Sequence, residues 1–312
     1  MKKTRFIPYA LAAVVAAVFP LLSGAYLQQV AITILLYMAL AVTWDMILRS
    51  GQLSFGTAGF FGLGSYASAL FFLRLGVDPV VGILLGGVFA GVVALLVGLA
   101  VLRLRGMYFA IVTLALASIF RVVVRNIPAL TGGAEGMMLP SVIFGGDATK
   151  LYGLALVVAV LAVLASEIFE RSRIRLALTS IRNDERVAKS SGINVFWYLV
   201  FVFTIASAIQ GIAGGTYVQV YGFVSPEGSF HANFLLLPLA MALLGGIHST
   251  WGPVLGALIL GMMGEYLKLQ IPYGHLLVYG GIIVLVTLFL PQGVVGAFRQ
   301  RLGAWQAARR SR

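Results

Sequence analysis

Cysteine is absent from this 312-residue chain, and charged residues make up only 10% of it. The lack of cysteine excludes disulfides and thiolate metal sites. The three histidines lie in predicted loops without metal-ligand spacing, and neither HExxH nor G-x-S-x-G occurs, so nothing predicts a metal site or an enzyme. Soluble domains average about 25% charged residues. The scarcity of charge, a 60% hydrophobic content and a mean hydropathy of +1.00 together indicate an integral membrane protein.

The apolar residues gather into segments that are each near the ~20 residues with which a helix crosses a bilayer. Backbone polar groups find no water in lipid, so these segments must be helices, broken only where protein buries them. We therefore predict an all-α membrane protein of about ten transmembrane or partly broken helices, in one domain over residues 1–312. The segments are 7–23, 27–48, 54–73, 79–102, 107–126, 151–169, 196–221, 233–247, 252–267 and 275–291. A cleaved signal peptide is the alternative for the first of them.

The basic residues divide unevenly between the two sides of the membrane. With the N-terminus inside, seventeen of the 22 Lys and Arg residues fall on the inner side. The positive-inside rule then places both termini and the loop 170–195 in the cytosol. The net charge of +12 does not predict nucleic-acid binding, because the basic residues stand at the ends of apolar runs, where they meet the membrane surface.

Glycine is frequent inside the apolar segments, with 37 in the chain. Small residues let helices approach closely in lipid, so most of these glycines are expected in helix packing. The stretch 51–56, GQLSFG, differs because polar side chains stand among helix-weakening glycines at a membrane edge. We predict a helix break that lines a cavity there, as in transporters, with Gly51, Gln52, Ser54, Phe55, Gly56 and Gly62 as candidates. Segment 54–73 is accordingly a candidate for a broken or re-entrant helix.

A short charged segment, residues 170–192, separates two apolar runs and carries nine charged residues. At 100° per residue, its basic side chains fall within a sector about 60° wide. We predict one helix from about 173 to 190, ended by Gly192 in the left-handed cap that favours glycine. The basic face holds Arg175, Arg182, Arg186 and Lys189, and the adjoining apolar face holds Ala177, Leu178, Ile181 and Ala188. A solvated loop that fixes topology or touches anionic lipid is the alternative.

Several blocks of the chain, in order, resemble the permease subunit of branched-chain amino-acid ABC transporters, of the type called the M subunit. Residues 51–66, GQLSFGTAGFFGLGSY, are similar to the family's GQxSFGxAxFxGxGAY. Residues 172–194 are similar to SRxGRAxxAIRxxExxAxxxGIN, and His248 stands where the family has glycine. Further blocks are GMYFAIVTLA, the TGGxxG block with Thr131, Gly132 and Gly133, GFVSPEGSF, LLGGIHSTWGPVLGA and PQGVVG.

The resemblance implies a type II-like ABC importer permease in a bacterial-type inner membrane. Its partners would be a second related permease, two cytosolic ATP-binding subunits and an extracytoplasmic substrate-binding protein. No Walker A sequence occurs, so ATP and Mg are expected on the partner subunits and no cofactor on this chain. Residues 171–192 correspond to a helix coupled to the ATPase, with Arg175, Ile181, Arg182, Glu185, Arg186, Ala188, Lys189 and Gly192 as the coupling residues. Thr131, Gly132 and Gly133 join the candidates for the translocation pathway.

Two other functions remain open at this point. We expect the solute to be branched-chain or other hydrophobic amino acids. Urea or a short amide is the alternative, because importers of these solutes share this subunit type. A secondary transporter or channel that works without an ATPase is the alternative from a different class. An ordered basic helix in the cytosol separates these classes, because a secondary transporter needs no dock for an ATPase.

Overall fold

The computed structural model describes residues 18–20, 22–270, 280, 281, 284, 293, 294 and 296. Over these residues the chain is a bundle of helices with one short antiparallel pair of strands, β1 and β2, in which Met137 lies opposite Val224. The long helices are α2 (Ala25–Leu48), α3 (Thr57–Leu75), α4 (Pro79–Val101), α5 (Met107–Arg125), α7 (Ala148–Arg171), α10 (Val195–Tyr221), α12 (Asn233–Gly245) and α13 (Trp251–Gln270). The short elements are α6 (Pro128–Thr131), β1 (Met137–Met138), η2 (Ile143–Gly146), α8 (Arg173–Asn183), α9 (Glu185–Ser190), β2 (Phe223–Val224) and α11 (Pro226–Ser229).

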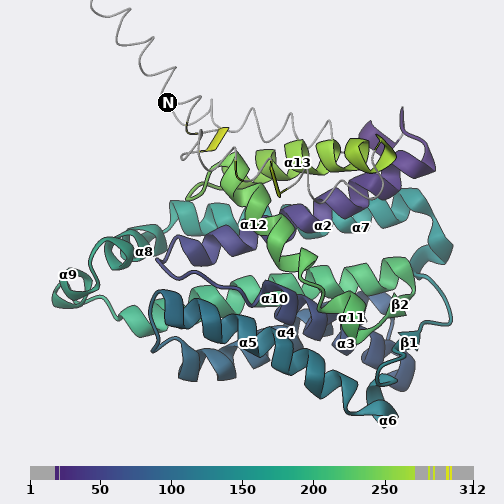
Figure 1. Cartoon of the computed structure of the whole chain (residues 1–312), viewed down its shortest axis with the longest axis horizontal. Coiled ribbons are helices and arrows are strands. Elements are labelled where there is room, and N and C mark those ends of the chain that lie inside the picture. Colours follow the sequence, from purple (N-terminus) through teal and green to yellow (C-terminus); the bar gives the residue numbers. More distant parts are fainter. Residues whose placement is uncertain are drawn as a thin grey trace, which may run out of the picture.

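The long helices form two layers, and most of them run along the same direction, whereas α12 crosses it steeply (Figure 1). One layer contains α2, α7, α12 and α13, and the other contains α3, α4, α5 and α10 (Figure 1). The helices α8 and α9 project at one end of the bundle, whereas α6, α11 and the two strands gather at the opposite end (Figure 1). The charged segment and the extended loops are thus kept apart by the full length of the helices.

The predicted membrane segments agree well with the helices. Every segment predicted between residues 27 and 267 corresponds to one long helix. Among the described residues, seven helices are long and apolar enough to cross a membrane. The seventh of these joins α11 and α12 over Pro226–Gly245 and continues through Pro238. The possibility that segment 54–73 is broken is wrong from Thr57 onward, since α3 is continuous from Thr57 to Leu75. A re-entrant course of this helix stays a prediction. Most of segment 7–23 and most of segment 275–291 lie outside the described residues.

Close backbone contacts join α3, α4 and α10. A Cβ atom on Gly64 would collide with the backbone of Gly211, and one on Gly214 would collide with the Phe61 carbonyl oxygen. A Cβ atom on Gly86 would lie 2.7 Å from the Gly64 carbonyl oxygen. Lipid supplies no hydrophobic drive for helix association, so this approach, which only glycine permits, is what holds the three helices together.

We expect Gly214→Ala to destabilise the bundle, because the added methyl group has no space beside Phe61. Overpacking of this kind costs about 1–3 kcal/mol. Gly153→Ala in α7 is the matched control, since nothing lies within 4 Å of its added Cβ atom. Thermal unfolding of the purified protein in detergent measures both, and equal melting temperatures for the two variants would contradict the packing role of Gly214.

Candidate functional site at the α8–α9 end of the bundle

The charged segment folds into two helices where one was predicted. Ser172 caps α8, with its hydroxyl oxygen accepting a hydrogen bond of 3.3 Å from the Ile174 amide. At Asp184 the backbone is extended, with φ −157° and ψ 113°, and its carboxylate accepts from the amides of Arg186 at 2.7 Å and Val187 at 3.3 Å. The prediction of one continuous helix is therefore wrong, because an aspartate side chain captures the amides that helix continuation would use.

Both helices bury an apolar face, as predicted, and expose their basic residues. Leu178 packs with Met46 of α2 and Phe169 of α7. Ile181 and Ala188 pack in a second cluster with residues of α3, α5 and α10. The buried set is Ala177, Leu178, Ile181 and Ala188, and the exposed set is Arg175, Arg182, Arg186 and Lys189. The 100° spacing does not carry across Asp184, so the four basic residues belong to two helices and no longer form the predicted single face.

Gly192 ends α9 as predicted. Its φ is +80°, in the left-handed region, and its amide donates to the Lys189 carbonyl at 3.0 Å. The Ile193 amide donates back to the Ala188 carbonyl at 3.1 Å. These two bonds are those of a Schellman cap, which fixes where α9 stops and where α10 begins.

Glu185 fastens α9 to the connection between α4 and α5. Its carboxylate lies 2.7 Å from Arg105 Nε and 2.9 Å from Lys189 Nζ. Burial alone would raise the pKa of Glu185, but the hydrogen bonds and positive charges of Arg105 and Lys189 outweigh it and lower that pKa. Glu185 was predicted as a coupling residue, and the structure gives it this anchoring contact.

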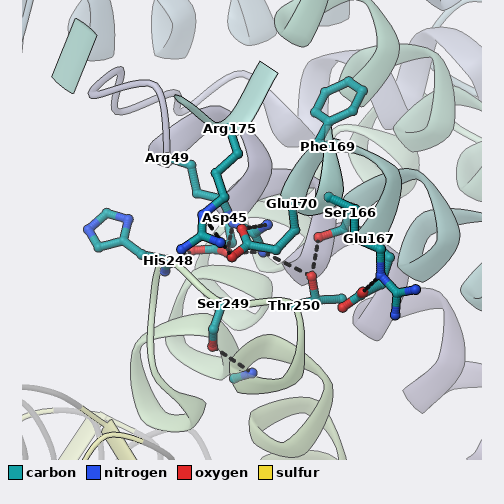
Figure 2. A network of polar contacts seen from close by, with 12 residues as sticks. Asp45, Arg49, Ser166, Glu167, Phe169, Glu170, Arg175, His248, Ser249 and Thr250 are labelled. Carbon is teal, nitrogen blue, oxygen red and sulfur yellow. Dashed lines mark hydrogen bonds and ion pairs between the residues drawn. The ribbon is translucent and has the colours of Figure 1, made fainter. Parts of the chain in front are cut away.

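A buried ion network lies beneath α8 (Figure 2). Arg49, at the end of α2, contacts Asp45 at 2.8 Å, as their spacing predicts, and Glu170 of α7 at 3.5 Å. Glu170 in turn lies 3.2 Å from Arg175 Nε of α8. The Asp45 carboxylate also accepts a hydrogen bond of 2.7 Å from the His248 amide, in the turn between α12 and α13. The i,i+4 spacing of Asp45 and Arg49 is visible in the sequence, whereas no local pattern indicates the contacts to Glu170 or to the turn.

A cavity of about 140 Å³ opens beside this network, lined by Met46, Arg49, Phe169, Glu170, Arg175, Leu178, Thr179, Arg182 and His248. His248 has φ +63°, in the left-handed region that favours glycine. Its ring points away from the carboxylates (Figure 2). Partial burial, with the positive charges of Arg182 and Arg49, lowers the pKa of His248 to about 4.

The lowered pKa makes stability depend on pH. In the unfolded chain the imidazole takes a proton below about pH 6.5, whereas in the folded chain it stays neutral until about pH 4. Folding therefore becomes less favourable as the pH falls from 6.5 towards 4. We expect His248→Asn, which tolerates a positive φ and does not titrate, to show a smaller drop in melting temperature between pH 7 and pH 5 than the parent chain. Equal drops in the two proteins would contradict this assignment.

The helix is interrupted at residues 51–56, as predicted, whereas a cavity lined by these residues stays a prediction. Between α2 and α3 the chain is non-helical, with Gly51 at φ +83°. This buried backbone is satisfied locally, because Trp44 Nε1 donates to the Ser54 carbonyl at 2.8 Å and the Phe55 amide donates to Thr113 Oγ1 at 2.9 Å. The polar side chains of Gln52 and Ser54 are buried here, and Gly56 begins α3.

The structure brings one candidate of this break next to the charged segment. A Cβ atom on Gly51 would lie 3.3 Å from the Arg182 Cα atom, so the break supports the last turn of α8. Gly62 lies deeper in α3, where a Cβ atom would collide with the ring of Phe230. A role of these residues in a solute pathway stays a prediction.

The three TGG residues lie at the opposite end of the bundle, in and after α6. Thr131 Oγ1 donates to the carbonyls of Val124 at 2.6 Å and Ile127 at 2.8 Å, which ties α6 to the end of α5. Gly132 and Gly133 have positive φ, and a Cβ atom on Gly132 would collide with the Gly136 carbonyl. The block therefore forms a tight turn that positions β1, and it does not meet the 51–56 break.

The chain matches, over residues 26–287, the model of the family described as branched-chain amino acid transport system / permease component. The chain belongs to this family. It is 29% identical to the high-affinity branched-chain amino acid transport system permease protein LivM of Escherichia coli (strain K12), over 93% of this chain and 74% of that protein. It is 28% identical to the permease protein LivH of the same organism, over 83% of this chain and 91% of that protein.

A more remote relative agrees with this membership. A probable branched-chain amino acid transport permease protein LivM of Methanocaldococcus jannaschii is 24% identical over 78% of each chain. Among solved structures, PsaBC from Streptococcus pneumoniae in complex with Fab has 18% identity and a TM-score of 0.45, covering 89% of this chain and 96% of that one. The last likeness is too low to support a conclusion about this chain.

Proposed function

We propose that this chain is the membrane-spanning permease subunit of an ATP-driven importer for branched-chain or other hydrophobic amino acids. The observation that carries the proposal is the pair α8–α9: an ordered, basic, exposed segment held by buried contacts at one end of an apolar bundle. Family membership supports the transport role, and the names of LivM and LivH support the solute class. The chain itself performs no catalysis under this proposal and binds no cofactor, and ATP with Mg belongs to its partners.

The distribution of charge supports an orientation for the subunit. The end with α8 and α9 also contains Arg49, Arg103 and Arg105, so it is the basic end, which the positive-inside rule assigns to the cytosol. Both termini would then lie in the cytosol. The opposite end, with α6, α11 and the strand pair, would face the substrate-binding protein outside the membrane.

The partners follow from the same arrangement. A second, related permease would complete the transmembrane unit, as the similarity to both LivM and LivH suggests. Two ATP-binding subunits would contact the exposed basic residues of α8 and α9, and surface charge of one sign favours recognition of a partner with the opposite sign. Short apolar patches between the arginines, such as exposed Leu176 and Val187, would complete that contact.

We expect the double change Arg182→Glu with Arg186→Glu to abolish co-purification of the ATPase subunits, because both side chains are exposed and reversing their charge opposes an acidic partner surface. Insertion into the membrane should be unchanged. The matched control is Arg121→Glu with Lys150→Glu, which reverses two exposed charges at the opposite end. Full ATPase retention by the α8–α9 variant would refute the docking role.

The solute class and the energy source are tested together in reconstituted vesicles that contain the two permeases, the ATPases and the binding protein. We expect uptake of leucine that stops when ATP is omitted, and no comparable uptake of urea. ATP-dependent uptake of urea alone would favour the short-amide importer. Leucine uptake that persists without ATP and without the ATPases would favour a secondary transporter.

A further inference from the structure

Arg49 is an unusual residue for the end of an apolar helix. It is 7% exposed, and its partner Asp45 is fully buried. Taking two charges out of water is costly, and well-packed apolar residues often replace such a pair without loss of stability. An ionisable group inside a membrane segment is therefore explained first by a function and only second by a contribution to stability.

The Arg49 guanidinium joins three parts of the bundle. Two of its nitrogens, Nε and Nη2, bind Asp45 of the same helix at 2.8 Å. Its Nη1 lies 3.5 Å from Glu170 of α7, and Nη2 also donates to Thr250 Oγ1 at 3.5 Å, directly before α13. Thr250 shares a hydroxyl hydrogen bond of 2.8 Å with Ser166 of α7. A planar group with five donors can hold several acceptors at once, which a lysine ammonium on the same stem cannot do in this geometry.

Glu170 connects this buried centre to the exposed segment. One of its carboxylate oxygens faces Arg49 and the other lies 3.2 Å from Arg175 of α8 (Figure 2). Its side chain is 30% exposed, between the 8% of Arg49 and the 59% of Arg175. The contacts thus form a continuous path from the surface helix to the interior, with Glu170 as the only link between the two arginines among the ion pairs of the described residues.

The path of contacts ends at the turn between α12 and α13, which is tightly packed. Cβ atoms on Gly245, Gly252 or Gly256 would collide with backbone atoms of the facing helix or of the turn itself. The helices α12 and α13 therefore meet without free space, and His248 holds the turn to Asp45 through its amide. A displacement of this turn must move both helices, because close-packed backbones do not deform gradually.

We propose that Arg49 is a positioning residue that transmits movement of α8 to α2 and to the α12–α13 turn. This proposal rests on the proposed function, in which the ATPases act on α8. When α8 shifts, Arg175 changes the position of Glu170, and Arg49 passes the change to Asp45 and Thr250. The ATPase need not contact any of the buried residues for the transmembrane helices to respond.

The test compares Arg49→Gln with Lys268→Gln in the complete, reconstituted importer. Both changes remove one basic residue from an ion pair, but Lys268 pairs with Glu265 in the last turn of α13, away from Thr250 at its start. We expect Arg49→Gln to retain assembly and ATP hydrolysis while the solute transported per ATP falls about tenfold or more, within the range typical of coupling between sites. Lys268→Gln should transport as much per ATP as the parent.

Two further variants keep the test decisive if Arg49→Gln does not accumulate. Arg49→Lys retains the positive charge but lacks the planar guanidinium with its several donors. Glu170→Gln retains both arginines while removing the carboxylate that they share. Both should lower transport per ATP at normal ATPase association. Normal transport per ATP in these two variants, whatever their melting temperature, would overturn the relay. Absence of ATP-dependent uptake in the parent importer would instead overturn the proposed function, so the two failures are distinguishable.

Discussion

The structure depends on how closely helices can approach in a solvent that does not drive them together. Between α3, α4 and α10, glycines at positions 64, 86, 211 and 214 bring backbone against backbone with no room for a methyl group. In lipid this contact replaces the hydrophobic drive of soluble cores. The same rule recurs where α12 meets α13, through Gly245, Gly252 and Gly256. Both layers therefore contain helices packed backbone against backbone, which leaves these helices little room to move past one another.

Buried charged residues are concentrated at one end of this tightly packed bundle. The buried cluster around Arg49 lies between α2, α7 and the turn before α13, directly under the exposed basic helix α8. Asp45 carries a second hydrogen bond, from the backbone of His248, so the carboxylate is held from two elements. Satisfied polar networks in low dielectric have well-defined geometry, and a partly broken one is costly. The site therefore favours discrete arrangements over gradual ones.

The sequence predicted the helices well because apolar runs near 20 residues leave a chain in lipid few alternatives. It also predicted the break at 51–56, the buried face of α8 and the cap at Gly192, since each depends on local spacing or on one residue type. The break at Asp184 was missed because the pattern of residue types in the sequence keeps a period of 100° per residue through this position. The competing cap, in which the Asp184 side chain accepts from the amides of Arg186 and Val187, is visible only in the structure. Glu170 and Thr250 were missed because their partners are far away in the sequence.

The break at Asp184 divides the ion pairs of the charged segment between the two layers of the bundle. Through Arg175 and Glu170, α8 is attached to the layer of α2, α7 and α13, whereas α9 is attached through Glu185 and Arg105 to the connection between α4 and α5, in the other layer. A rigid partner that binds both short helices would be connected to one layer through α8 and to the other through α9. Rotating that partner would change the angle between the layers without bending any transmembrane helix, so the bundle can act as a pair of levers with Asp184 at the joint.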